Sequence, residues 1–276
     1  MSEHALRSTD GGARTSRAAV AAARKHKRVS PDRWWPWLFV LPSVAGVAIF
    51  SLWPIIRTFY LSFTESGPFG GATWVGLANF QKLLSDPNVG WAILNSLTYT
   101  LIGMFGIPLS LLLASIINRP GFRLARFYRV VFFLPFIAMP VATVMVWRII
   151  FNGNFGIINQ ALAVIGIKGP GWLTTPGLLI VVISLIGLWG GIGFNMIVLS
   201  AGLKGIPYDY YEAAELDGAS KSRQFVSITA PLMTPTIFFL MIMQFIGGFQ
   251  VFTALYVIMG PHNPQMAKSQ TLVYLF

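Results

Sequence analysis

The chain has 276 residues, of which 55% are hydrophobic and 11% are charged, and its mean hydropathy is +0.65. Ordinary soluble domains are about 25% charged, so this sequence has too few charges to cover a surface that faces water. No charge occurs in residues 169–203, and only a neutral histidine interrupts the uncharged residues 224–267. A soluble enzyme and a disordered protein are therefore excluded. A disulfide scaffold is excluded as well, because the chain contains no cysteine.

Five hydrophobic runs are long enough to cross a bilayer, which takes about 20 mostly apolar residues in a helix. We place them at residues 37–61, 91–117, 129–151, 176–201 and 232–259. The runs are continuous rather than alternating, which favours helices over a barrel. The predicted fold class is all-α, a polytopic membrane helix bundle. Residues 269–276 begin another apolar run, so we expect a sixth span to follow beyond this sequence.

Lysine and arginine are distributed unevenly between the connections. Eight precede the first run, and the next five connections carry one, three, one, three and one, with Arg129 at the edge of the third run. Positive residues are retained on the cytoplasmic side, so the N-terminus is predicted to be cytoplasmic. This distribution accounts for the net charge of +11 without a nucleic-acid partner. Residues 1–33 have no apolar period and are predicted to be a disordered basic arm, and residues 34–276 the transmembrane domain.

The connection between the fourth and fifth runs, residues 203–231, carries four of the nine carboxylates: Asp209, Glu212, Glu215 and Asp217. Its sequence predicts two short helices separated by a turn. Pro207 suits the first helical position, and an acidic residue two positions later suits the first turn. Gly218 is typical of the left-handed residue that ends a helix, and Ser220 is a good cap for the next helix.

Asp217 falls near the C-terminus of the first helix, where a carboxylate opposes the helix dipole. We therefore expect backbone amides of the following turn, or a basic group on a partner, to hold it. Glu212 and Glu215 form an acidic face in a connection that the orientation rule expects to be positive. This face is either a solvated surface or a docking surface for a basic partner, which the small Ala213 and Ala214 would allow to approach closely.

The segment Glu212-Ala213-Ala214, followed by Asp217-Gly218-Ala219, resembles the EAA loop of type I ABC importer permeases. Phe225, Ile228, Pro231 and Pro235 continue the resemblance at the same spacing. Residues 132–135, 189–196, 203–207 and 247–252 are similar to the carbohydrate-uptake branch, the maltose and glycerol-phosphate type of inner-membrane subunit. The resemblance covers residues 37–276, and the visible departure from the family is the final span, which we expect to follow beyond this sequence.

The resemblance implies the type I ABC importer permease fold and a coupling helix that docks in a cleft of a cytoplasmic ATPase. The residues carried over to this docking element are Glu212, Ala213, Ala214, Asp217 and Gly218. It also implies that the chain lies in a bacterial inner membrane. The implied partners are a cytoplasmic ABC ATPase dimer, a second and different permease, and an extracytoplasmic solute-binding protein. No Gly-x-x-x-x-Gly-Lys-Ser/Thr phosphate-binding motif occurs. The chain is therefore predicted to be no enzyme and to bind no cofactor or metal, with ATP and Mg²⁺ on the ATPase.

Polar side chains in the middle of a span usually face a cavity or a helix partner. Uncharged donors and acceptors suit a neutral polyhydroxylated solute, and aromatic side chains offer apolar faces to sugar rings. The candidates for the substrate path are Asn195, Gln244, Gln250, Trp189, Phe249 and Phe252. The alternative is hydrogen bonding between helices. Because Gln244 and Gln250 are six residues apart, one helical face cannot present both.

Glycines and prolines interrupt several runs. The glycines at positions 190, 191, 193, 247 and 248 indicate either close helix packing or hinges for gating. Pro108, Pro135 and Pro140 are predicted to kink or locally unwind their helices.

These observations predict a permease subunit of an ATP-driven, binding-protein-dependent sugar importer, which forms half of the translocation path. A permease for glycerol phosphate or another polyol is the first alternative, although it needs a cationic pocket that is not found at mid-depth. A secondary transporter would need a carboxylate within a span, and no span has one. A membrane-embedded enzyme is disfavoured because the three histidines, His4, His26 and His262, lie outside the spans.

Overall fold

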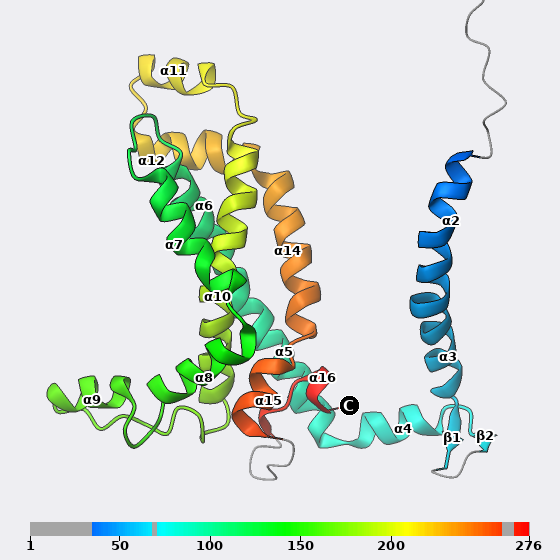
Figure 1. The fold of residues 1–276 in the computed structure, drawn as a ribbon. Coiled ribbons are helices and arrows are strands. Elements are labelled where there is room, and N and C mark those ends of the chain that lie inside the picture. The colour runs from blue at the N-terminus through cyan, green and yellow to red at the C-terminus, as the bar shows by residue number, and fades with distance from the viewer. Residues whose placement is uncertain (1–34, 68–70, 261–267, 276) are drawn as a thin grey trace, which may run out of the picture. The chain divides into compact units, whose positions relative to one another are not determined.

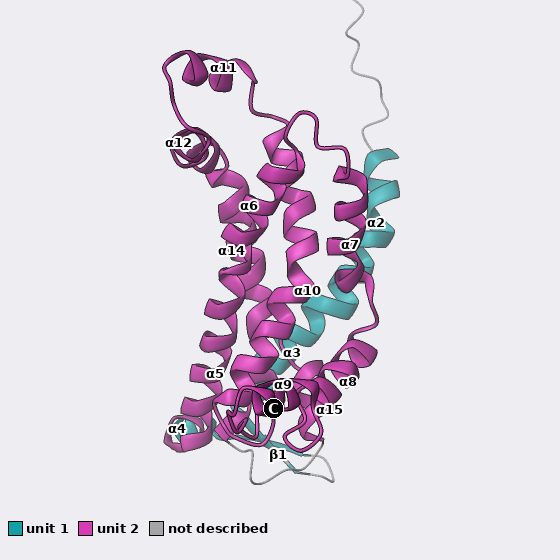
Figure 2. Cartoon of the chain, turned by 90° about the vertical axis from the view of Figure 1, so that its left-hand side faces the viewer, with its two compact units in different colours: residues 1–81 teal, residues 82–276 magenta. Residues whose placement is uncertain are grey.

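The structure, a computed structural model, describes residues 35–67, 71–260 and 268–275. The basic arm that was predicted to be disordered lies outside these residues. The chain divides into two compact units, residues 1–81 and residues 82–276 (Figure 2). Helices dominate both. The described residues contain one small antiparallel hairpin, in which β1 (Thr64–Ser66) pairs with β2 (Ala72–Trp74).

The first unit contains the first span as a continuous 27-residue helix, Trp35–Leu61. It comprises α2 (Trp35–Val47), the π-helical turn η1 (Ala48–Leu52) and α3 (Trp53–Leu61). In η1 the Trp53 amide donates to the carbonyl of Ala48, directly before Pro54, which has no N–H to continue the regular ladder. After the hairpin, the side-chain amide of Asn79 donates to two carbonyls beside β1, those of Ser62 and Thr64, at 3.0 Å each. These bonds fix the start of α4 (Ala78–Ser85).

The second unit holds the other predicted spans, as Figure 2 shows. Its apolar helices are α5 (Pro87–Met104), α6 (Gly106–Ile117), α7 (Ala125–Ile137), α8 (Pro140–Ile150), α10 (Leu178–Leu203), α14 (Thr234–Phe249) and α15 (Thr253–Met259). The shorter elements are α9 (Ile157–Val164), α11 (Asp209–Leu216), α12 (Lys221–Gln224), the π-helical turn η2 (Phe225–Thr229), α13 (Ala230–Leu232) and α16 (Leu272–Leu275). Four helical segments of the described chain are long and apolar enough to cross a membrane, or five if the bent pair α7–α8 is one span.

The third span departs from the single run predicted over residues 129–151. It is broken into α7 and α8, whose axes meet at 95°. Ala138 and Met139 between them have ψ values of 146° and 119°. Met139 directly precedes Pro140, and the residue before a proline is disfavoured in the helical conformation. The predicted kink at Pro140 is therefore confirmed, and it is sharp enough to start a new helix. Pro135 lies within α7.

The second span also has a break, at Phe105 between α5 and α6. Pro108 follows three residues later and cannot donate a hydrogen bond to the preceding turn. The interruption that Pro108 predicted is confirmed, although it falls on the N-terminal side of the proline.

Helix α10 is the centre of the second unit and packs against α5, α6 and α7. The largest buried cluster joins α6 and α10 to the start of α14 and contains Ile107, Leu111, Met196, Leu199, Met233 and Leu240. Two glycines allow backbones to approach, as small residues do in membrane bundles. A Cβ at Gly193 would collide with the Phe132 carbonyl of α7, and one at Gly248 with Thr100 of α5. The packing interpretation is thus confirmed at these two positions. Gly190, Gly191 and Gly247 have open space.

Candidate functional site

The acidic loop, residues 203–231, lies at one end of the second unit, beyond the ends of α10 and α14 (Figures 1 and 2). Its first helix, α11, begins at Asp209, two residues after the position predicted from Pro207. The Pro207 carbonyl accepts only a long bond of 3.4 Å, from Tyr210, whereas the Tyr208 carbonyl accepts from Tyr211 at 2.8 Å and from Glu212 at 3.2 Å. Regular hydrogen bonding therefore starts at Tyr208, and Asp209 lies in the first turn as predicted.

The turn after α11 has the geometry that Gly218 predicted. Gly218 is left-handed, with φ of 75°. Its amide donates to the Glu215 carbonyl at 3.0 Å, and the Ala219 amide donates to the Ala214 carbonyl at 2.8 Å. These two bonds form a Schellman motif, which ends the helix and satisfies its last carbonyls. Ser220 then caps α12 through its hydroxyl, which accepts from the amide of Arg223 at 3.4 Å, so the predicted cap is confirmed.

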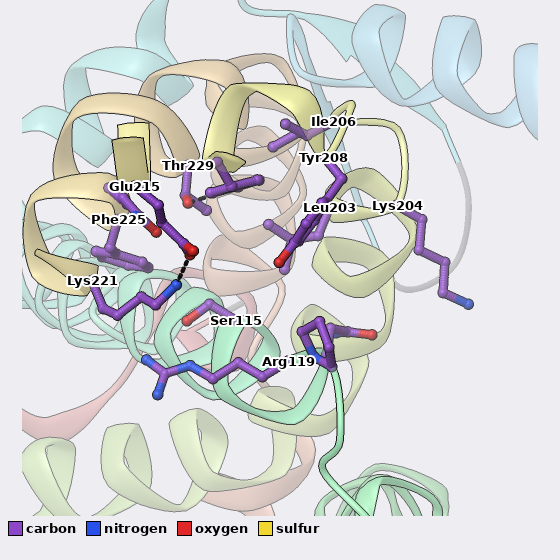
Figure 3. Close-up of a pocket in the computed structure, with 14 residues that line it drawn as sticks. Ser115, Arg119, Leu203, Lys204, Ile206, Tyr208, Glu215, Lys221, Phe225 and Thr229 are labelled. Carbon is purple, nitrogen blue, oxygen red and sulfur yellow. Dashed lines mark hydrogen bonds and ion pairs between the residues drawn. The ribbon is translucent and has the colours of Figure 1, made fainter. Parts of the chain in front are cut away.

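Three side-chain contacts tie α11 and the turn after it to the elements that follow. The hydroxyls of Tyr211 and Thr229 are hydrogen-bonded at 2.9 Å. The side-chain amide of Gln224 donates to the Ala219 carbonyl at 3.2 Å. Lys221 forms an ion pair with Glu215 (Figure 3). The hydrogen bond from Lys221, followed by its positive charge, lowers the pKa of the Glu215 carboxyl.

A pocket of about 570 Å³ lies between this loop and the ends of α6 and α10 (Figure 3). Its walls include Arg119 after α6, Lys204 after α10 and the ion pair just described. The acidic loop is therefore not packed flat on the bundle. The loop is connected to the bundle at the base of α12 and η2, where Phe225 packs against the buried cluster.

The side of α11 away from Tyr211 is exposed and carries Ala213, with Asp217 at the helix cap and the exposed Glu212 at its edge, next to Glu215. Among the described residues, no group forms a hydrogen bond or ion pair with the carboxylates of Glu212 and Asp217. The expectation that backbone amides hold Asp217 is wrong, because the amides of Gly218 and Ala219 are already used by the Schellman motif. The expectation of a basic group on a partner stays a prediction. Ala214 is half-buried.

Leu216 was missed in the sequence, although it is the most conspicuous residue of this face. Its side chain is 90% exposed at the end of α11, beside the unpartnered carboxylates. A leucine in a short helix is ordinarily assigned to the core, so its position alone gave no signal. An exposed leucine beside unpaired carboxylates on a firmly held helix is an arrangement suited to binding another protein.

The candidate residues for the substrate path do not form one group. Asn195 is 9% exposed and lies beside α6, where a Cβ at Gly106 would be 4.0 Å from its amide nitrogen. The Gln244 side chain lies directly against Gly103 of α5. Both amides therefore contact helices of their own chain. Trp189 is 39% exposed, and its ring meets that of Trp147 edge to face at 5.4 Å.

Gln250 and Phe252 lie in a break of the fifth span that the sequence analysis did not predict. Helix α14 ends at Phe249 and α15 begins at Thr253, so residues 250–252 are not helical. The premise that Gln244 and Gln250 share one helix is therefore wrong. The Phe252 ring stacks on Tyr256 at 5.3 Å and meets Tyr274 at 6.0 Å. The Phe249 ring instead packs on Phe245 of α14, with ring centroids 4.8 Å apart.

Residues 268–275, here called the return segment, cover this break. The buried Thr271 hydroxyl donates to the Val251 carbonyl at 2.8 Å, which satisfies a backbone group that the break leaves free. The side-chain amide of Asn95 in α5 donates to the carbonyls of Lys268 and Gln270 at 2.8 Å each. The hydroxyl of Ser96 accepts from the Leu272 amide at 3.1 Å. These polar residues were also missed, and their only signal was their occurrence in otherwise apolar runs.

Comparison with known proteins agrees with this architecture. Residues 106–271 match the family described as "Binding-protein-dependent transport system inner membrane component". The lactose transport system permease protein LacF of Rhizobium radiobacter is 34% identical over 84% of this chain and 80% of its own length. The sn-glycerol-3-phosphate transport system permease protein UgpA of Agrobacterium fabrum is 34% identical over 89% of this chain and 84% of its own length.

A solved structure of a bacterial ABC transporter involved in the import of the acidic polysaccharide alginate matches with a TM-score of 0.76. It is 25% identical, and the match covers 91% of this chain and 85% of that chain. The predicted all-α permease fold is thereby confirmed. The chain is a multi-pass membrane permease rather than an enzyme, and it belongs to the family of inner-membrane components of binding-protein-dependent transport systems.

Proposed function

We propose that this permease forms half of the translocation path of an ATP-driven sugar importer in a bacterial cell membrane, with its N-terminus in the cytoplasm. The acidic loop then lies in the cytoplasm and docks on a separate ABC ATPase dimer, which binds ATP and Mg²⁺. A second, different permease completes the path, and an extracytoplasmic solute-binding protein delivers the solute. The docking element is Glu212, Ala213, Ala214, Asp217 and Gly218.

The observation that carries the docking proposal is the contrast between the two faces of α11. One face is held by Tyr211 and by the Glu215–Lys221 ion pair. The other exposes Leu216, with the carboxylates of Asp217 at the helix cap and Glu212 at the edge, and neither carboxylate has a partner in the described chain. A fixed helix with an unpartnered face of this kind is suited to transmit force, because its side chains need no reordering when a partner binds.

Sugar is the cargo that the residues support best. LacF transports lactose by its name, and the solved transporter imports a polysaccharide. The proposed path residues Asn195, Gln244 and Gln250 are uncharged hydrogen-bonding groups, and Trp189, Phe249 and Phe252 supply aromatic faces. Gln250 and Phe252 lie at non-helical backbone, which within a membrane is tolerated where it lines a cavity or is buried in protein.

A phosphorylated polyol is the second candidate cargo, and one observation favours it. UgpA is named for sn-glycerol 3-phosphate, and a phosphate needs a cation. Because α8 turns away from α7, Arg148 reaches α15, where its guanidinium donates to the Val257 carbonyl at 3.4 Å. Arg148→Gln separates the cargoes, since it should abolish uptake of a phosphorylated polyol and leave uptake of a neutral sugar intact.

Co-purification tests the docking proposal directly. Glu212→Lys, expressed with the ATPase and the second permease, should reduce the amount of ATPase recovered with this chain. Glu212→Gln is the matched control, because it removes the charge without reversing it and should have a smaller effect. Unchanged recovery of the ATPase with Glu212→Lys contradicts the docking role. Solute accumulation by vesicles that contain this chain alone would instead support a secondary transporter.

A further inference from the structure

The helix α11 is connected unequally to the spans before and after it. Every side-chain hydrogen bond and ion pair that α11 makes leads forward, through Tyr211 to η2 and through Glu215 to α12. Toward the preceding residues, α11 makes a ring contact between Tyr211 and Tyr208, with centroids 6.2 Å apart. In the described part of the chain, no side-chain hydrogen bond or ion pair joins α11 back to α10. The link to α10 is only the short stretch that contains Gly205 and Pro207, with backbone bonds such as Ile206 to Leu203 at 3.2 Å.

The Tyr211–Thr229 contact has the properties of a structural strut. Thr229 is 4% exposed, and its hydroxyl is bonded across 18 residues rather than to its own helix. Thr229 ends η2, where the Ala230 amide donates to the Phe225 carbonyl in a π-helical turn. The chain then continues through α13 into α14. The strut therefore joins the middle of α11 to the element that starts the fifth span.

Without this strut, α11 could tilt independently of α14, because both of its ends are connected through glycines. It is flanked by Gly205 on one side and by the left-handed Gly218 turn on the other. In the Glu215–Lys221 ion pair, the side chains are 45% and 64% exposed, and exposed pairs contribute little. The half-buried Tyr211 hydroxyl is thus the contact that sets the angle of α11 over η2.

We propose that Tyr211 is a positioning residue, whose hydroxyl bond to Thr229 makes α11, η2 and α14 move as one body when the ATPase displaces α11. The displacement is then passed to the fifth span, which contains the break at residues 250–252, and is not absorbed by tilting of α11. This inference rests on the docking role proposed for the acidic loop.

The absence of cysteine in the sequence makes the test direct. Asp209 and Phe239 are exposed positions on α11 and α14, and both are replaced by cysteine and spin-labelled in the assembled transporter. Pulsed electron paramagnetic resonance measures the distance distribution between the labels without nucleotide and with ATP and vanadate. In the otherwise unchanged chain we expect one narrow peak whose position is the same in both states.

Tyr211→Phe and Thr229→Val should each replace the narrow peak with a broad distribution. Loss of one such hydrogen bond shifts the ratio of two conformations by about two- to tenfold. The population of molecules in which α11 is tilted relative to α14 should therefore rise by about that factor. Thr229→Ser keeps a hydroxyl and should therefore retain the narrow peak. Tyr210→Phe, on an exposed tyrosine of the same helix, is the matched control and should change nothing.

Co-purification of the ATPase distinguishes this inference from the function on which it rests. Tyr211→Phe should retain the ATPase while the peak broadens. A narrow peak in Tyr211→Phe overturns the strut, even if docking is intact. A change in label distance between the two nucleotide states of the unchanged chain also overturns it, because α11 and α14 would then move separately.

Discussion

The acidic loop and the break in the fifth span both interrupt helices, but their backbone groups are satisfied in opposite ways. In the acidic loop, the backbone groups have partners at most five residues away, as in the Ala219–Ala214 bond and the Ser220 cap. In the break, the Val251 carbonyl is satisfied by Thr271, 20 residues later, and the segment that supplies Thr271 is held by Asn95 across more than 170 residues. A bilayer offers no water to exposed backbone groups, so distant side chains must supply the bonds.

The largest effect is expected at Gly218, where the acidic loop depends on one residue. Gly218→Asp should abolish solute uptake while the protein still reaches the membrane. A Cβ at this position meets nothing within 4 Å, so the fold is not crowded. The substitution adds a protruding negative charge to the docking surface beside Asp217, and the left-handed conformation costs a side chain about 1–2 kcal/mol.

The matched control is Gly218→Asn, because asparagine has a similar shape, tolerates the left-handed conformation and adds no charge. It should keep a measurable part of the uptake of the unchanged protein. Full uptake by Gly218→Asp at normal expression would refute the role of this turn in coupling.

The same contrast explains how much was predictable from the sequence. Gly218 and Ser220 each act on neighbours, so the end of α11 and the start of α12 were predicted to the residue. The start of α11 was misplaced because Pro207 suits several positions near a helix start. Pro140 predicted the position of the break in the third span. No proline occurs at residues 250–252, and the fifth span was therefore predicted as continuous.

The direction of side chains within the spans was the least predictable feature. Asn195 and Gln244 were correctly placed in long apolar helices, but their depth says nothing about which neighbour they face. Helix α10 is apolar on nearly all sides, so no amphipathic period indicates its orientation. Only the packing of Gly106 against Asn195 and of Gly103 against Gln244 settles where these amides lie.

The next largest effect concerns the helix contacts that the glycines make possible. Gly193→Ala should destabilise the protein by about 1–3 kcal/mol, because its Cβ would meet backbone atoms of α7 that cannot yield. Gly191→Ala has open space and should be neutral or stabilising by up to about 1 kcal/mol, since alanine is the better helix former. Thermal unfolding of the detergent-solubilised protein measures both.

Substitutions of these two glycines also distinguish a role in helix packing from a role as a hinge for gating. If residues 190–193 act as a hinge, Gly191→Ala should lower uptake without lowering stability. Equal stability of the Gly191→Ala and Gly193→Ala variants would contradict the close approach of α10 and α7.

A smaller effect is expected at the break in the fifth span. Thr271→Val keeps the shape of the side chain but leaves the Val251 carbonyl without its donor. Hydrogen bonds between membrane segments contribute about 0.6–1.7 kcal/mol, so unfolding in detergent should occur at a slightly lower temperature. Thr271→Ser retains the hydroxyl and should unfold like the unchanged protein. If the valine and serine variants are equally stable, this bond does not hold the break.

The smallest effect is expected from the Glu215–Lys221 ion pair, which is the only loop contact that depends on pH. Lys221 lowers the pKa of Glu215 below its ordinary value of 4.5. The pair therefore stabilises the folded loop above pH 4.5, and this contribution is lost as pH falls through the lowered pKa of the folded state. Lys221→Met should slightly lower the unfolding temperature at pH 7 and leave it unchanged below that pKa.

Lys168→Met, where no carboxylate is paired among the described residues, should show no such pH dependence. Because both partners are exposed, high salt should also remove the difference at pH 7. A difference that persists in acid or in high salt would mean that Lys221 stabilises the loop through its aliphatic stem rather than its charge.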